Sequence, residues 1–291
     1  MKLATLRTST GTKAARLDGD EYVLLEHADV GALLASGRDW SRRASAAHGK
    51  RVSVQDVDLA ALLPHPNKII CLGLNYATHI KEMGRDTPEY PTLFAKYDGA
   101  LIGPYDPVVL PRVSDCVDWE AELGVVIGRP ARHVPKSRAL DFVGGYTVVN
   151  DVTVRDWQRR TREFLSGKTF EHTTPVGPVL VTADEFGAAE PDLELSCSVD
   201  GQQMQCSRTS DLLFGVADIV SYVSDIITLL PGDLIATGTP GGVGDGRDPK
   251  LYLQPGQQLV TTIEGIGELR NVCIAESSPN GSTDPRAPYN L

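Results

Sequence analysis

Short apolar runs separated by polar turn residues make up most of this chain. Runs rich in Val, Ile, Leu and Tyr that are bounded by Gly, Pro, Asn or Asp are typical of β-strands. The pattern therefore predicts an α+β protein that is mostly β. The expected strands lie near 1–8, 22–27, 68–73, 107–111, 118–128, 144–151, 179–182, 193–199, 234–236, 259–266 and 269–275.

Helical patterns are fewer than strand patterns. Short helices are expected at 28–36, at 38–48 and near 137–143, and a longer one at 213–230. In the longest, apolar side chains recur at helical spacing and predict one buried stripe. The residues of this stripe are Val216, Ile219, Val220, Val223, Ile226 and Ile227.

The stretch Asp118–Gly128 joins an acidic start to an apolar, β-branched end. Its acids, Asp118, Glu120 and Glu122, alternate with other residues, and on a strand this spacing points all three to one face. Carboxylates crowded together repel one another, and a hard divalent cation such as Mg²⁺ or Mn²⁺ relieves that repulsion. The alternative is an ordinary solvated edge strand.

A second candidate for chemistry is the short helix expected at 75–84. His79 and Glu82 lie three residues apart on it, so they share a face and can form a hydrogen bond. A carboxylate beside an imidazole orients the ring and makes it a better base. The alternative is a surface ion pair. Because Gly73 and Gly84 flank this helix, it could act as a lid.

Composition narrows the possible functions. The formal net charge of −10 argues against a nucleic-acid binder, which needs a basic face. Neither a membrane-spanning apolar window nor a signal-peptide core is apparent, so we expect a soluble, cytoplasmic protein with no membrane partner. The five cysteines are scattered without a Cys-x-x-Cys pair, which favours reduced thiols over a zinc site.

Several motifs occur in a fixed order along the chain: GLNYATHIKEMG, FAK, DWEAELGVVIG, GYTVVNDVTVRDWQ, GKTFEHTTPVGP and PGDLIATGTPGGVG. Together they resemble the fumarylacetoacetate hydrolase family, in particular its short bacterial branch of acylpyruvate hydrolases and related decarboxylases and isomerases. The resemblance covers roughly residues 64–275. It implies a rolled, mixed β-sheet catalytic domain at 64–275 after a small N-terminal domain at 1–63. The polar residues 276–291 are expected to form a disordered tail.

The resemblance also implies a metal site. Glu120, Glu122 and Asp151 match the carboxylates that hold Mg²⁺ or Mn²⁺, and Asp118 would be a neighbour of these ligands. Longer eukaryotic members carry another acidic ligand just before the histidine, whereas residues 70–78 contain no acid here. The match is therefore to a site with three carboxylates.

Catalytic and binding roles follow from the same match. His79 and Glu82 correspond to a pair that activates water, and Lys168 corresponds to a lysine that stabilises developing oxyanion charge. The implied substrate is a small diketo or keto acid, and the implied assembly is a homodimer. The residues expected to contact the substrate carboxylate or carbonyl groups are Arg155, Gln158 and Thr239.

The activity that this resemblance favours is hydrolysis of a C–C bond in a 1,3-diketo acid, such as an acylpyruvate, through a metal-bound enolate. The metal polarises the carbonyl groups, and His79 removes a proton from the attacking water. Two alternatives within enzymes use the same site, namely decarboxylation of oxaloacetate and isomerisation of a hydroxydienoate. A more remote alternative is a catalytically silent metal- or ligand-binding protein.

Overall fold

One large mixed sheet runs through the molecule, as expected of a mostly β protein. The computed structural model describes residues 1–82 and 86–277. Its strands are β1 (Lys2–Thr8), β2 (Gly11–Asp18), β3 (Glu21–Leu24), β4 (Arg51–Ser53), β5 (Asp58–Leu59), β6 (Ile69–Gly73), β7 (Thr92–Ala95), β8 (Leu101–Ile102), β9 (Val108–Leu110), β10 (Val117–Asp118), β11 (Ala121–Ile127), β12 (Val143–Asn150), β13 (Thr153–Val154), β14 (Thr174–Thr182), β15 (Glu194–Val199), β16 (Gln202–Arg208), β17 (Leu234–Ala236), β18 (Gln258–Ile263) and β19 (Gly267–Ala275).

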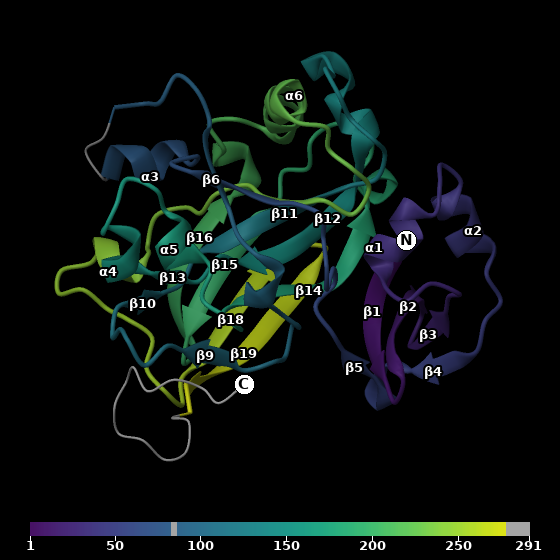
Figure 1. Ribbon diagram of the computed structural model, residues 1–291, viewed down its shortest axis with the longest axis horizontal. Helices are drawn as coiled ribbons and strands as arrows, with labels where there is room; N and C mark the ends of the chain where they lie inside the picture. The colour runs from purple at the N-terminus through teal and green to yellow at the C-terminus, as the bar shows by residue number, and fades with distance from the viewer. Residues whose placement is uncertain (83–85, 278–291) are drawn as a thin grey trace.

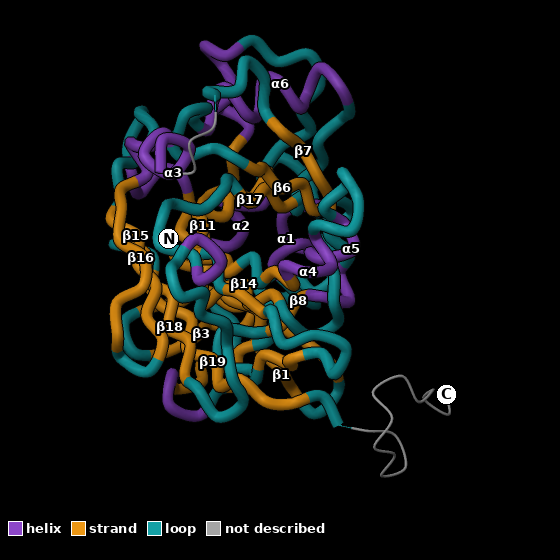
Figure 2. Tube along the Cα trace, turned by 90° about the vertical axis from the view of Figure 1, so that its left-hand side faces the viewer, coloured by secondary structure: helices purple, strands orange, loops and turns teal. Residues whose placement is uncertain are grey.

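The helices are short and lie mainly on the outside of the strands. Figure 1 shows α3 and α6 near one end of the molecule and β19 toward the other, and Figure 2 shows the same division after a quarter turn. The α-helices are α1 (Val30–Ala35), α2 (Trp40–Ala46), α3 (Ala77–Glu82), α4 (Arg155–Gln158), α5 (Leu165–Lys168) and α6 (Val216–Ile226). The helix predicted near 137–143 is a 3₁₀ helix, Lys136–Phe142.

The large sheet follows the order β4-β3-β2-β1-β14-β12-β11-β17-β6-β7. Its middle is the core of the protein, because every residue of β11 and β12 is buried. β17 pairs in parallel with β6 and antiparallel with β11, so the sheet is mixed. The fold class predicted from the sequence is confirmed.

A second sheet, ordered β16-β15-β18-β19-β9, packs against the first. Its β15–β16 hairpin turns at Asp200 and Gly201, both with positive φ, as two-residue hairpin turns require. Buried and less buried side chains alternate along β15 and β18, which is the pattern of a sheet with one face on the core.

Helix α6 is shorter than the predicted 213–230. It begins after Gly215, where the Glu190 carboxylate accepts hydrogen bonds from the backbone N–H groups of Val216 (2.8 Å) and Ala217 (2.9 Å). The four earlier apolar residues of the predicted stripe are buried. The last two are wrong, because Ile226 and Ile227 are 58% and 46% exposed and the backbone is extended at Ile227.

The N-terminal strands continue the large sheet, since β1 pairs with β14 as well as with β2 and β5. Thr5, in the middle of β1, is buried and ties two other segments to this edge. Its hydroxyl donates a hydrogen bond to the carbonyl of Leu62 (2.7 Å) and accepts one from the N–H of Val30 (3.1 Å). The boundary predicted at residue 63 stays a prediction.

The end of the described chain is held by backbone contacts. The N–H of Glu276 donates to the carbonyl of Leu110 (3.0 Å), so the chain remains attached one residue past β19. The rest of the predicted disordered tail, from residue 278 onward, lies outside the described residues.

Replacing Thr5 with valine should destabilise the fold, because the change leaves the buried Leu62 carbonyl and Val30 N–H without their partner. We expect a loss of about 1–3 kcal/mol in the free energy of unfolding, measured by urea denaturation. Thr262→Val is the matched control, because this residue lies half-buried on β18. Equal stabilities for the two variants would contradict the assigned role of Thr5.

Candidate active site

A pocket with a volume of about 370 Å³ collects most of the residues that the sequence singles out. Segments far apart in the chain form its wall. They are the end of β6, the start of β11, α4, α5 and the loop after β17. The predicted site residues in this wall are Glu120, Glu122, Arg155, Gln158, Lys168 and Thr239.

The pairing of β11 with β12 brings the acids of the site together. Ala121 faces Asn150 in the register, so Glu120 and Asp151 lie side by side just beyond the paired ends. The N–H of Asp151 donates to the carbonyl of Glu120 (2.8 Å), and the N–H of Glu120 donates to the side chain of Asn150 (3.0 Å). Carboxylate oxygens of Glu120, Glu122 and Asp151 all lie within 4.8 Å of one another.

The prediction that Asp118 shares a strand face with Glu120 and Glu122 is wrong. The strand is interrupted at Trp119 and Glu120, so Asp118 belongs to β10 and Glu122 to β11. The indole of Trp119 is buried and donates to the carbonyl of Gly242 (3.2 Å), so the residue after Asp118 is fixed against the loop that follows β17.

Asp118 instead anchors the glycine-rich loop that follows β17. Its carboxylate accepts hydrogen bonds from the N–H groups of Gly244 (2.7 Å) and Asp245 (3.0 Å) and from Nε of Arg155 (2.8 Å). Asp118 is therefore a neighbour of the acidic triad, as expected, but it is turned toward the loop and toward the arginine.

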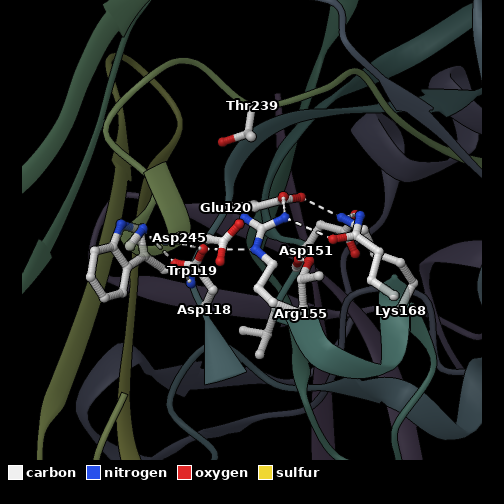
Figure 3. A network of polar contacts seen from close by, with 12 residues as sticks. Asp118, Trp119, Glu120, Asp151, Arg155, Lys168, Thr239 and Asp245 are labelled. Carbon is white, nitrogen blue, oxygen red and sulfur yellow. Dashed lines mark hydrogen bonds and ion pairs between the residues drawn. The ribbon is translucent and has the colours of Figure 1, made fainter. Parts of the chain in front are cut away.

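Buried cations surround the acids (Figure 3). Nζ of Lys168 contacts Oε2 of Glu120 and lies 2.7 Å from Oδ2 of Asp151. The guanidinium of Arg155 joins Oδ2 of Asp118 and Oε1 of Glu120, each at 2.8 Å. Every carboxylate oxygen of Glu120 thus faces a positive charge.

Lys96 is the site residue that sequence reasoning left without a role. Its Nζ contacts Oδ1 of Asp151 at 2.5 Å, and the side chain is 1% exposed. The only sequence signal was the short motif Phe94-Ala95-Lys96, in which the lysine was equally consistent with a structural position. The structure places Lys96 in direct contact with one of the predicted metal ligands.

The charges of this cluster do not cancel. Four buried carboxylates, those of Asp118, Glu120, Glu122 and Asp151, face three buried cations. Burial, followed by the charges of Asp151 and Glu120, raises the pKa of Glu122 well above its ordinary value. Burial also raises the pKa of Asp151, but Lys168 and Lys96 outweigh it and lower that pKa below its ordinary value. Without a cation nearby, the charged form of Glu122 is therefore disfavoured.

The residues predicted to bind substrate differ in their hydrogen-bond partners. Oε1 of Gln158 accepts from Arg155 (3.1 Å), and Oγ1 of Thr239 donates to the carbonyl of Ala121 (2.9 Å). Nη2 of Arg155 is buried and has no hydrogen-bond partner among the residues that the structure describes. A donor of this kind at a pocket wall suits an anionic ligand.

Helix α3 follows directly on the pocket wall, since Leu72, Gly73 and Leu74 line the cavity and the helix begins at Ala77. Leu74 has a positive φ of 56°, which is strained for a leucine and turns the chain toward the helix. The side chains of His79 and Glu82 lie outside the described part of the chain, so their predicted roles remain predictions.

Arg159 is an exposed residue that also lines the pocket. Its guanidinium, 51% exposed, forms an ion pair with Asp245. Asp245 also accepts hydrogen bonds from Lys250 and Tyr252, each at 2.8 Å. Spacing along the sequence could not reveal this contact, because it joins α4 to a loop about ninety residues later (residues 159 and 245).

A pocket of this size with buried acids and lysines in its wall is typical of an enzyme that acts on a small molecule. The chain belongs to the fumarylacetoacetate hydrolase family: the model of the fumarylacetoacetate (FAA) hydrolase C-terminal family matches residues 68–274. The resemblance noted from the sequence motifs is confirmed.

Named relatives and solved structures align with most of this chain. The mitochondrial oxaloacetate tautomerase Fahd2a of Rattus norvegicus is 41% identical over 236 residues, covering 80% of this chain and 75% of the relative. A fumarylacetoacetate hydrolase from Exiguobacterium antarcticum has a TM-score of 0.84 at 33% identity, covering 95% of this chain and all of its own. The 5-carboxymethyl-2-hydroxymuconate delta-isomerase of Mycobacterium smegmatis has a TM-score of 0.79 at 35% identity, covering 96% of this chain and 100% of its own.

Among the residues that the structure describes, no helix is long and apolar enough to cross a membrane. The cytoplasmic location expected from the composition and the homodimer implied by the resemblance stay predictions.

The acidic triad fits a divalent cation by the chemistry of its donors. Mg²⁺ and Mn²⁺ prefer carboxylate oxygens, and all three acids are buried with donor atoms close together. A bound cation would also remove the excess negative charge. Each carboxylate oxygen has a further lone pair for a metal while it accepts a hydrogen bond from lysine or arginine.

Adding Mn²⁺ to metal-free protein should raise the unfolding temperature, because the ion binds only the folded site. The expected stabilisation is about 2.7 kcal/mol when free Mn²⁺ exceeds its Kd a hundredfold. Glu122→Gln should reduce this shift, since it removes a charged ligand, whereas Glu171→Gln at an exposed position should not. An unchanged shift in Glu122→Gln, measured by calorimetry, would count against the site.

Proposed function

We propose that this protein is a metal-dependent enzyme that interconverts the enol and keto forms of a small 2-oxo dicarboxylic acid, of which oxaloacetate is the simplest example. The observation that carries this proposal is the charge balance of the buried cluster. Its acids exceed its cations by one charge, so a bound divalent ion leaves a single net positive charge facing the pocket. An anionic 2-oxo acid complements that charge.

The reaction needs a proton to leave C3 of the keto form and a proton to arrive on the oxygen at C2. Negative charge therefore develops on that oxygen, and a fixed ammonium group in a dry site stabilises it most. We assign this role to Lys168, because its Nζ lies between Glu120 and Asp151 and the residue lines the pocket. A divalent ion held by the acidic triad would act as a Lewis acid toward the same oxygen.

Arginines are suited to hold the substrate carboxylates. The free Nη2 of Arg155 is a donor inside the pocket wall, and Arg162 also lines the cavity. Because Asp118 and Glu120 fix the other two nitrogens of Arg155, its remaining donor is held in one direction. Such a guanidinium binds a carboxylate with little loss of side-chain entropy.

The comparisons support this choice of reaction. The tautomerase of Rattus norvegicus is identical to this chain at 41% of the aligned residues. The protein from Mycobacterium smegmatis, at 35% identity, is also named as an isomerase. Decarboxylation of oxaloacetate, considered from the sequence, would develop charge on the same oxygen.

Loss of the Lys168 ammonium should slow tautomerisation, since it removes the charge next to the developing oxyanion. We expect Lys168→Met to lower kcat at least about 100-fold, followed by the ultraviolet absorbance of the enol of oxaloacetate with Mg²⁺ or Mn²⁺. Lys136→Met, at a position 64% exposed, is the control. Lys168→Arg, which keeps the charge, should retain more activity than Lys168→Met.

The proposal is wrong if the purified protein with bound Mn²⁺ does not accelerate tautomerisation. It is equally wrong if Lys168→Met, shown to be folded and to bind Mn²⁺, retains the full rate. Because Lys168 is buried, the unfolding temperature of the Lys168→Met protein is measured first. The Lys168→Arg variant then separates the loss of charge from the loss of the fold.

Hydrolysis of a C–C bond in an acylpyruvate is the second candidate, and it is favoured by the position of α3. This helix carries His79 and Glu82 and begins three residues after Leu74 in the pocket wall. In this reaction a water molecule, deprotonated by His79, attacks the carbonyl distal to the pyruvate unit. The bond between that carbon and C3 breaks, giving a carboxylic acid and pyruvate.

Hydrolysis should depend on the imidazole of His79, because an unassisted water is a poor nucleophile at neutral pH. We expect His79→Ala to lower acetylpyruvate cleavage at least about 100-fold, measured as pyruvate release. His172→Ala, in an exposed loop, is the control. A wild-type rate of cleavage in His79→Ala would exclude this mechanism. If the unmodified protein does not cleave acetylpyruvate, hydrolysis of this substrate is excluded.

A further inference from the structure

A second cavity, of about 550 Å³, lies at the opposite end of the strands that carry the candidate active site. Asn67 comes just before β6, Pro231 just before β17 and Gly128 just after β11, and all three line this cavity. The other ends of the same strands lead to the active-site pocket. At about 3.3 Å per residue, the seven residues of β11 separate the two cavities by roughly 20 Å.

The charge of this distal cavity is opposite in sign to that of the whole protein. Three arginines and one aspartate line it, in a chain whose net charge is −10. Asp141 is paired with Arg138, with 2.9 Å between Oδ2 and Nε. Among the described residues, neither Arg38 nor Arg129 has an ion-pair partner. Both guanidinium groups therefore remain available to an anion from outside the chain.

The rest of the cavity is apolar. Leu34 of α1 and Phe142 lie on its wall with Pro130, Leu230 and Pro231. Its volume is within the range of ligand pockets, which typically combine apolar walls with a few charged groups. A carboxylate could meet the arginines in a bidentate arrangement while an apolar body covers the leucine and phenylalanine side chains.

The cavity wall is held in place by buried contacts. The indole of Trp40, on α2, donates to the carbonyl of Gly128 (3.2 Å), and the N–H of Gly128 donates to the carbonyl of Phe142 (2.8 Å). A wall that is fixed before binding loses little entropy when a ligand arrives. Because α1 and α2 precede the family-matched segment 68–274, a ligand here would touch both parts of the chain.

We propose that the distal cavity is a binding site for a small monocarboxylate with an apolar body, held by Arg38 and Arg129. The proposed tautomerase reaction makes no use of this cavity, so the inference stands independently of that function. The alcohol analogue of such a ligand would lose the negative charge and the bidentate pairing with arginine, so it should bind much more weakly.

The test is calorimetric titration of the full-length protein, with Mn²⁺ present, using 4-phenylbutyrate and octanoate as probes. We expect saturable binding of one probe per chain. Replacing both Arg38 and Arg129 with glutamine should weaken it at least tenfold, and 4-phenylbutan-1-ol should bind at least tenfold more weakly than the acid. Arg270→Gln, which makes a single charge change at a 46% exposed position, should leave the affinity unchanged.

Four outcomes would overturn the proposal. They are no saturable binding of either probe, full affinity in the double variant, equal binding of the alcohol, and a molecular mass that falls in the double variant. The last result, from light scattering, would mean that the cavity is an interface between copies of the chain. Because Arg38 and Arg129 are exposed and lie outside the candidate active site, the double variant should keep its unfolding temperature and its catalytic rate.

Discussion

Burying more negative than positive charge is the constraint on which this structure depends. Isolated ions inside a protein are unfavourable by several kcal/mol, so each acid of the cluster needs a partner. Lys96, Lys168 and Arg155 supply partners for Asp118, Glu120 and Asp151. Among the described residues, the hydrogen-bond donor to the Glu122 carboxylate is the N–H of Gly238 (2.9 Å). The raised pKa of Glu122 and the fit of a divalent ion are two expressions of this imbalance.

The same imbalance connects stability with chemistry. Crowded carboxylates favour the binding of a divalent cation, and a cation held there would add positive charge beside the pocket. Arg155 takes part in both effects, since it neutralises Asp118 and Glu120 and still presents an unpaired nitrogen. The proposed activity rests on this arrangement of buried charges.

Much of this could be predicted from the sequence. Short apolar runs bounded by turn residues located the central strands but missed others, such as β2 and β16, and ordered motifs identified Glu120, Glu122 and Asp151 as one cluster. Other features depend on contacts between distant segments. The indole of Trp119 bonds to Gly242 where the strand is interrupted, and α6 starts at Val216, where Glu190 satisfies its first N–H groups. Such contacts leave no periodic trace in the sequence.

The register of β11 and β12 has a consequence for how the family can vary. A slip by one residue would turn every side chain of a strand to the other face, so Asp151 could no longer reach Glu120. The pairing is regular at this acidic end and shifts between Val126 and Ile127, at the other. A change of length beyond that irregularity would leave Glu120 beside Asp151, whereas a change between that irregularity and the acidic end would separate them.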